Sequence, residues 1–353
     1  MKFYKKVLIA IIIVIFTCII WNLLKRREII MRNSQKDVPR FEGFSFFSDP
    51  DSEIADLKDS NKVVIDNINP KYTNKPLREY VIKSSFNSAL SGKNVNPEMI
   101  KYVLNRGCRF LDFEVFYIND RVEVAVSTDD DFNFIDTENS LLLDNVFTTI
   151  ISNAFISPTP NTTDPVFIHL RIKSKEPKIY KEIAHVIDTT LRAKLYPKPV
   201  TNDTKLSEIM GKIVIVVDKT TDREYKTHTK CEQKEKGCID LAKFINMESG
   251  SETLFLQHYG ELLNQCANPP VILDNCDLCT NVNKMRLVLP DINYENTSNP
   301  DISEFILNYG CQIVPYRFYM KDEELGRYEE LFNYNNSAFI PLAKAMDYIR
   351  KIH

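Results

Sequence analysis

Residues 106–116 have the sequence RGCRFLDFEVF, the stretch on which the interpretation of the whole chain depends. Its second half is rich in aromatic and β-branched residues, which is typical of a β-strand. Because side chains alternate between the two faces of a strand, Asp112 and Glu114 share one face, and the apolar residues beside them occupy the other. Two acids on one face of an otherwise apolar strand need either a metal ion or a positively charged partner.

Outward from this stretch, strand-like and helix-like segments alternate along the chain. β-Branched and aromatic runs typical of strands occupy 81–86, 110–117, 122–128, 166–173, 213–219, 285–290 and 312–318. Apolar residues at helical spacing occupy 97–107, 140–155 and 179–195, and a terminal helix is predicted over 341–351. This alternation predicts βαβ units around a parallel sheet or barrel.

Five segments, in order, resemble the X and Y boxes of the eukaryotic phosphoinositide-specific phospholipases C. They are LREYVIKSSFNSALSG (77–92), RGCRFLDFEVF (106–116), DPVFIHLRI (164–172), MGKIVIVVDK (210–219) and SNPDISEFILNYGCQIVPYRF (298–318). The resemblance implies an α/β fold, a TIM-type (β/α) barrel split by an X–Y insertion. Its X-box half would cover 77–220, and its Y-box half with a C-terminal helix would cover 283–353.

The chemistry of that family requires a calcium ion, two histidines and phosphate-binding cations. At the position of the first histidine this chain has Phe86, and at the second it has Val126 or Ser127. None of these side chains carries an imidazole, so we expect no catalytic residue. Of the five histidines only His169 lies on a matching strand, and we interpret it as a hydrogen-bonded structural residue.

The calcium-ligand positions are altered as well. Asn87, Asp112 and Glu114 occupy three of them, with the two acid types exchanged, but Arg171 replaces the remaining acid. A guanidinium about 4 Å from a divalent ion would cost about 8 kcal/mol at an effective dielectric near 20. The sequence therefore predicts no bound metal and no cofactor, and a salt bridge from Arg171 to Asp112 and Glu114 in the former metal position.

The phosphate-binding cations of the family are also replaced. Val216 and Asp218 occupy the positions of two lysines, and Leu287 and Leu289 those of an arginine and a tyrosine, although a one-residue shift would restore Arg286. We therefore expect no small-molecule substrate.

A polar, charged stretch over 221–282 interrupts the pattern and predicts an insertion between the two halves. Four of its cysteines are candidates for a zinc knuckle or for disulfides, with free thiols as the remaining alternative: Cys231, Cys238, Cys276 and Cys279.

The N-terminus predicts a membrane anchor. Val7–Leu24 is an almost unbroken apolar run, long enough to span a bilayer core of roughly 30 Å. Basic residues and Trp21 follow it in place of a small-residue cleavage site, so residues 1–27 are predicted to be an uncleaved single-pass anchor with its flanks. Residues 28–76 would form a stalk. The excess of basic residues after the run favours a main domain on the cytoplasmic side.

Composition narrows the class of function. The formal charge of −3 provides no basic field for nucleic acid, and neither GxGxxG nor GxxxxGK[ST] occurs. The prediction is a catalytically inactive, membrane-anchored structural or docking protein with protein partners. Its most specific form is a minor capsid protein or membrane-to-shell tether at the inner membrane of a large DNA virus. The alternatives are an active phosphoric diester hydrolase on phosphoinositides with relocated catalytic groups, and a non-cleaving lipid-binding module.

Overall fold

The structure is a computed structural model that describes Thr17 and residues 50–57, 62–231, 237–264, 285–291 and 297–352. Within these ranges no helix combines the length and the apolar character needed to cross a membrane. Apart from Thr17, the predicted anchor over Val7–Leu24 lies outside the described residues.

The largest sheet is built mostly from the X half and carries the candidate site. Its strands are ordered β5-β4-β3-β6-β7-β8, and β2 pairs with β3. Their bounds are β2 Ser84–Ser85, β3 Phe110–Ile118, β4 Arg121–Ala125, β5 Leu141–Leu142, β6 Val166–Ile172, β7 Ile213–Asp218 and β8 Met247–Ser249. The pairs β2–β3, β3–β6, β6–β7 and β7–β8 are parallel. Every residue of β3, β6 and β7 is buried, as expected for parallel strands covered on both faces.

Smaller sheets involve the C-terminal part of the chain. β1 (Tyr80–Ile82) pairs antiparallel with β11 (Phe339–Pro341), and β9 (Leu254–His258) pairs parallel with β10 (Met285–Leu289). The predicted strand over 312–318 is present only as isolated bridges, from Ile313 to Ile82 and Leu287 and from Tyr316 to Ser85. Among the described residues no ladder joins β8 to β9, so the complete barrel stays a prediction.

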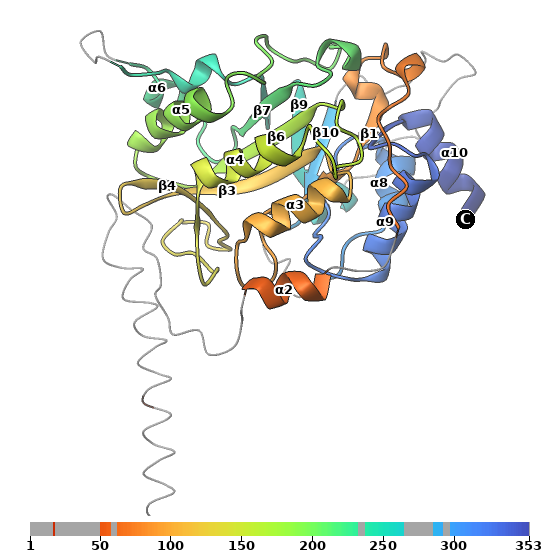
Figure 1. Cartoon of the computed structure of the whole chain (residues 1–353), viewed down its shortest axis with the longest axis horizontal. Coiled ribbons are helices and arrows are strands. Elements are labelled where there is room, and N and C mark those ends of the chain that lie inside the picture. The colour runs from red at the N-terminus through yellow and green to blue at the C-terminus, as the bar shows by residue number, and fades with distance from the viewer. Residues whose placement is uncertain are drawn as a thin grey trace, which may run out of the picture.

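Helices surround these sheets. Figure 1 shows α3, α4 and α5 across one face of the large sheet, and α8, α9 and α10 grouped at one end of the molecule. The longer helices are α2 Pro50–Leu57, α3 Pro97–Asn105, α4 Leu143–Asn153, α5 Lys178–Thr190, α8 Ile302–Tyr309, α9 Glu323–Tyr334 and α10 Leu342–Ile352. The short ones are α6 Tyr225–His228 and α7 Tyr259–Leu263, with 3₁₀ turns at Pro70–Tyr72, Leu77–Glu79, Leu206–Glu208 and Leu241–Lys243.

Local sequence explains where several of these helices begin and end. The side chain of Asn96 accepts a hydrogen bond from the backbone N–H of Glu98 and caps α3 directly before Pro97. Asp322 caps α9 in the same way. Helix α8 ends at Gly310, whose left-handed backbone (φ 61°) suits a residue without a Cβ.

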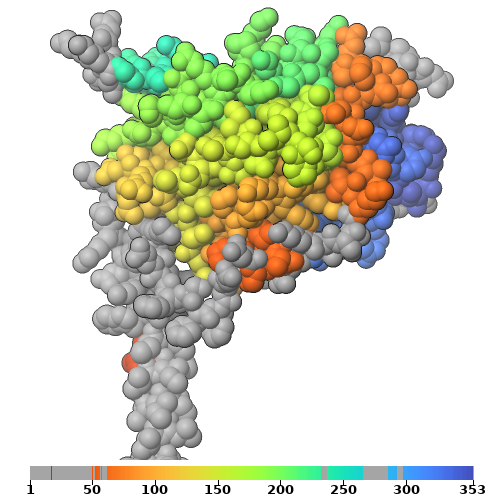
Figure 2. Space-filling view, viewed as in Figure 1, coloured from red at the N-terminus to blue at the C-terminus, as the bar shows by residue number. Residues whose placement is uncertain are grey.

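The predicted stalk over 28–76 was wrong for its second part. Ile54 and Leu57 of α2, and Ile65 and Ile68 beyond it, are all buried in the main core. In Figure 2 the orange segment before β1 runs between the green surface of the X half and the blue C-terminal residues. Residues 50–57 and 62–76 therefore belong to the folded domain, because these four apolar side chains pack in its core.

The predicted insertion over 221–282 was also too wide. β8, β9 and α7 all come from it, and Met247, Leu254 and Leu262 are buried in the main core. These strands are only three and five residues long and carry polar residues such as Glu248, so their sequence shows no strand periodicity. Part of the stretch therefore completes the domain.

Candidate functional site

The candidate site is built on two adjacent parallel strands. In the β3–β6 ladder Asp112 lies opposite His169, and Glu114 lies opposite Arg171. Because the side chains of both strands alternate with the same period, these four residues share one face of the sheet. The acids predicted to share a strand face therefore meet their partners on the neighbouring strand.

Arg171 is the centre of this group. Its Nε donates to Asp112 Oδ1 at 2.9 Å and its Nη2 to Asp112 Oδ2 at 2.6 Å, a bidentate pair. Its Nη1 donates to Glu114 Oε1 at 2.7 Å, and Nη2 also donates to Asn87 Oδ1 at 2.7 Å. Arg171 is only 8% exposed and Asp112 and Glu114 are enclosed, so the predicted salt bridge is present and buried.

Phe86 and Asn87 close this group from the loop after β2. The Phe86 ring, in the position of the family's first histidine, lies 4.6 Å from the guanidinium carbon of Arg171, close enough for a cation–π contact. The backbone N–H of Asn87 donates to Asp112 Oδ2 at 3.1 Å. Asn87 adopts a positive φ of 43°, which asparagine tolerates better than most residues. An aromatic ring therefore covers a cation here.

A second cation completes the group. Lys173 Nζ lies 3.1 Å from Glu114 Oε2 and donates to the carbonyl oxygen of Ser127 at 2.6 Å. The backbone N–H of Ser127 also donates to Glu114 Oε2, at 2.7 Å, while Val126 is buried in the core. The sequence analysis counted two acids against Arg171 alone. Lys173, two residues along the same strand face, could have been found by the same alternation, and with it the formal charge sums to zero.

His169 links Asp112 to a serine that the sequence analysis missed. Its Nδ1 lies 2.7 Å from Asp112 Oδ1, and its Nε2 lies 2.8 Å from Ser249 Oγ on β8. Acid, imidazole and hydroxyl stand in the order of a catalytic triad. All three residues are 0% exposed and the carboxylate is already held by Arg171, so a substrate has no access to the hydroxyl. The hydrogen-bonded structural interpretation of His169 therefore fits these contacts.

The electrostatics agree with a closed ion cluster. Burial by itself would raise the pKa of Asp112, but the charge of Arg171 and the hydrogen bond from His169 outweigh it and hold that pKa well below its usual range. Asp112 is therefore ionised throughout the physiological pH range.

The residues present do not fit a calcium ion. Both oxygens of Asp112, Glu114 Oε1 and Asn87 Oδ1 accept hydrogen bonds from Arg171, and Glu114 Oε2 accepts from Ser127. A cation at this position would have to displace a guanidinium held on three residues. Within the described ranges no group of three or more histidine, cysteine or acidic side chains is placed to hold a metal.

The residues that the resemblance aligns with phosphate-binding positions take part in packing and turns. Val216, Leu287 and Leu289 are buried in the core. The carboxylate of Asp218 accepts from the backbone and hydroxyl of Thr220 and stabilises the turn after β7. Among the described residues, Arg286 makes no hydrogen bond or ion pair with the Arg171 cluster, which consists of Asn87, Asp112, Glu114, Arg171 and Lys173. Its Nη1 donates to Gln257 at 2.8 Å.

The cysteine predictions are resolved only in part. Cys231 and Cys238 form a disulfide, which excludes them from a zinc knuckle, whereas Cys276 and Cys279 lie outside the described residues. Structural disulfides are typical of oxidising compartments. The side of the membrane on which the domain lies stays a prediction.

Comparisons with known proteins agree with this architecture. Residues 73–219 match the family described as phosphatidylinositol-specific phospholipase C, X domain. This part of the chain is phospholipase C-like. No curated protein sequence matches the chain.

Two solved structures share this fold. PLC21 of L. pealei superposes with a TM-score of 0.58 at 18% identity, covering 78% of this chain and 38% of that one. PLC21 of S. officinalis gives a TM-score of 0.56 at 18% identity, covering 79% and 38%. A calcium-dependent phosphoinositol-specific phospholipase C from Pseudomonas sp. gives a TM-score of 0.42 at 11% identity, covering 80% and 100%. The chain thus spans 38% of the length of the two PLC21 proteins, and at this identity the likeness shows the fold alone.

Proposed function

We propose that this chain is a catalytically inactive phospholipase C-like protein that acts as a membrane-anchored structural or docking component. One observation carries the proposal: Arg171 donates to both oxygens of Asp112, to Glu114 and to Asn87, the three residues that the resemblance aligns with calcium ligands. A divalent cation and this guanidinium cannot share those oxygens.

The general acid and base positions support the same proposal. Phe86 lacks a titratable group and is packed on Arg171, and Val126 is buried. His169 has both ring nitrogens engaged and is fully enclosed. No side chain of this cluster is positioned to transfer a proton or to stabilise the charge of a phosphoryl group.

A stable fold without its reactive groups is suited to binding other molecules through its surface. The proposed anchor over Val7–Leu24 would hold the domain at a membrane and leave its loops accessible to protein partners. Attachment between a viral membrane and its shell remains the most specific form of this proposal, and it rests on the anchor and the composition.

Activity measurements on the full chain test this proposal. Purified protein in neutral detergent is assayed on phosphatidylinositol and phosphatidylinositol bisphosphate, with and without calcium, and we expect no turnover. Phe86→His is expected to restore none, because the metal position is still filled by Arg171. Turnover that is abolished by Asp112→Asn would overturn the proposal and favour a hydrolase with relocated groups.

A binding measurement separates a lost metal site from a weak enzyme. Calcium at millimolar concentration is expected to leave the melting temperature unchanged, because a ligand that binds only the native state would raise it. A calcium-dependent rise that disappears in Asp112→Asn would show that the metal site survives.

A further inference from the structure

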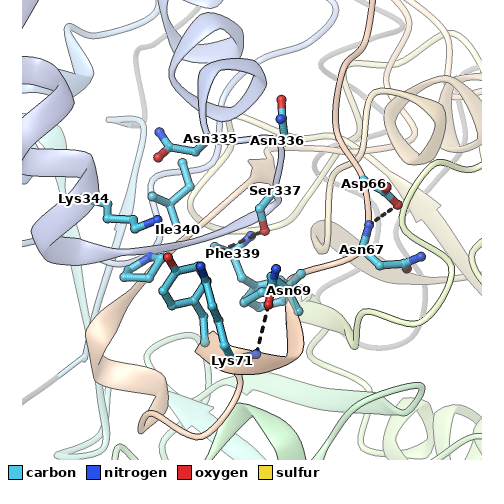
Figure 3. Close-up of a pocket in the computed structure, with 13 residues that line it drawn as sticks. Asp66, Asn67, Asn69, Lys71, Asn335, Asn336, Ser337, Phe339, Ile340 and Lys344 are labelled. Atoms are coloured by element: carbon cyan, nitrogen blue, oxygen red, sulfur yellow. Dashed lines mark hydrogen bonds between the residues drawn. The ribbon is translucent and has the colours of Figure 1, made fainter.

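A polar cavity of about 340 Å³ lies between the segment before β1 and the C-terminal part of the chain. Residues 66–72 form one wall, and residues 335–341 with Lys344 form the other (Figure 3). It shares no lining residue with the Arg171 cluster, and nothing in the proposed function depends on it.

The two walls are joined by hydrogen bonds, so the cavity is preformed. The backbone N–H of Asp66 donates to the carbonyl oxygen of Asn336 at 3.2 Å, and that of Val64 donates to Asn333 Oδ1 at 3.1 Å. On the other side the Tyr80 hydroxyl donates to the carbonyl oxygen of Tyr72. Phe339 and Ile340, two apolar residues of the lining, belong to β11 and are buried.

Two lysines from opposite walls meet at one tyrosine. Lys71 Nζ lies 4.7 Å and Lys344 Nζ 4.1 Å from the centroid of the Tyr72 ring. Hydrogen bonds from Lys344 and Lys71 lower the pKa of the Tyr72 phenol, because they favour its ionised form. Within the described part of the chain, neither lysine has a carboxylate partner. Two like charges directed at one hydroxyl repel each other unless an anion lies between them.

The acid of the cavity does not neutralise these lysines. Asp66 accepts a hydrogen bond from the backbone N–H of Asn67 at 2.7 Å and lies across the cavity from Lys344 in Figure 3. Two ammonium groups and one carboxylate leave the lining with a formal charge of +1.

Two asparagines of the lining present side-chain donors, Asn69 near Lys71 and Asn67 beside Asp66 (Figure 3). Asn67 Oδ1 accepts from the N–H and the hydroxyl of Thr163, both at 2.8 Å, and Asn69 Oδ1 accepts from the N–H of Lys71 at 3.1 Å. With their oxygens engaged, both side chains offer their NH₂ groups as donors. The site therefore favours a ligand that is anionic and rich in oxygen acceptors.

We propose that this cavity binds a ligand carrying a phosphomonoester, with Lys71 and Lys344 on the phosphate and the asparagine amides on polar groups next to it. A phosphomonoester carries a charge of about −1.5 to −2 at pH 7, which two ammonium groups match. The volume is near the lower end of the roughly 300–1,000 Å³ found for small-molecule sites, so it accommodates more than a bare phosphate ion.

Calorimetric titration of the full chain in neutral detergent tests the assignment. Glycerol 3-phosphate is expected to bind, inorganic phosphate to bind more weakly, and glycerol not to bind. The double variant Lys71→Gln/Lys344→Gln is expected to lower the affinity for glycerol 3-phosphate at least about tenfold, the change that 1.4 kcal/mol produces. Both lysines are exposed, so the melting temperature of the variant should match that of the native chain.

Lys351→Gln is the matched control. Lys351 lies on the same helix as Lys344, is exposed and pairs with Asp347 outside the cavity, so its loss should leave the affinity unchanged. Absence of binding at millimolar glycerol 3-phosphate would overturn the assignment, as would an equal loss of affinity in Lys351→Gln and in the double variant.

The source of the phosphate is decided by a second pair of titrations. Detergent micelles containing phosphatidic acid are compared with micelles containing phosphatidylcholine, in the native chain and in the double variant. Lysine-dependent binding to phosphatidic acid micelles that exceeds binding of glycerol 3-phosphate supports a lipid headgroup, and the reverse supports a soluble phosphomonoester. Lysine-independent binding in both arms contradicts the assignment.

Discussion

Two buried ion clusters hold this domain together in different ways. The Arg171 cluster lies within the X half and joins neighbouring strands of one sheet. The other joins the two halves: Glu329 of α9 accepts from Arg106 Nε at 2.6 Å and lies 3.3 Å from Lys83 Nζ. Lys83 also donates to the carbonyl oxygen of Arg106 at 2.7 Å.

The clusters differ in how their charges are balanced. In the first, two acids face two cations and Arg171 contacts both acids. In the second, Glu329 alone faces both Lys83 and Arg106. The shared partner is therefore a cation in one cluster and a carboxylate in the other. Removing Glu329 strands two buried cations, and removing Arg171 strands Asp112 while Glu114 keeps Lys173. Removing a peripheral member leaves a pair intact.

The largest effect is expected for Arg171→Ala. Stranding a buried partner typically costs about 3–5 kcal/mol, and here two carboxylates are enclosed. Urea unfolding at neutral pH should show a loss in this range. Lys173→Ala is the control on the same strand: Glu114 keeps Arg171 and the N–H of Ser127, so the loss should be about 1 kcal/mol. Equal losses in the two variants would mean that Arg171 is not the centre of the cluster.

Glu329→Gln should follow, with a loss of about 2–3 kcal/mol in the free energy of unfolding. The amide keeps one acceptor but removes the charge that Lys83 and Arg106 share, and hydrogen bonds to charged groups contribute about 1.5–3 kcal/mol. Glu330→Gln, at an exposed position on the same helix, should change stability by less than about 0.5 kcal/mol. If both variants behave alike, the second cluster does not join the halves.

A further difference is expected in how the free energy of unfolding of the native chain and of Arg171→Ala depends on pH. Because the pKa of Asp112 is lowered in the native chain, its contribution is present above the ordinary aspartate pKa of about 3.9 and is lost as the pH falls below it. In Arg171→Ala the raising effect of burial is less opposed, so the native state binds the proton more readily and acid favours folding. The stability difference between the two chains should narrow by about 2 kcal/mol between neutral pH and about pH 3.

The titration of Asp164 does not disturb that comparison. Burial raises its pKa to about 6, so it titrates in the same experiment. Since it is present in both chains, its contribution cancels in the difference. A difference that stays constant with pH would show that Asp112 keeps its lowered pKa without Arg171.

Sequence alone predicted the salt bridges from Arg171 to Asp112 and Glu114. It did not predict the Glu329 cluster, because Glu329 is far along the chain from its partners. Strand alternation placed Asp112 and Glu114 together, and the family positions added Arg171. Glu329 lies 223 residues from Arg106 and on a helix that no matched segment covers, so nothing in the sequence links them.

The same limit explains the other differences from the sequence analysis. The long apolar strands of the X half were predicted nearly to the residue. Ser249 was missed because it ends a three-residue strand in the stretch taken for an insertion. The cavity walls at 66–72 and 335–341 are joined by the backbone hydrogen bond from Asp66 to Asn336, which the side-chain pattern does not encode.

The smallest effect is expected for Lys83→Met. Glu329 keeps both of its contacts with Arg106, and methionine fills a similar volume without a charge. The remaining loss is the unpaired carbonyl of Arg106, about 1 kcal/mol, offset by removing a cation whose side chain is 0% exposed.

Burial lowers the pKa of Lys83, so between its folded pKa and about 10.4 the unfolded chain binds more protons and stability rises with pH. Lys83→Met should lack that rise, which urea unfolding of both chains from neutral to alkaline pH would reveal. A loss as large as that of Glu329→Gln would show that Lys83, and not Glu329, is the shared partner of the second cluster.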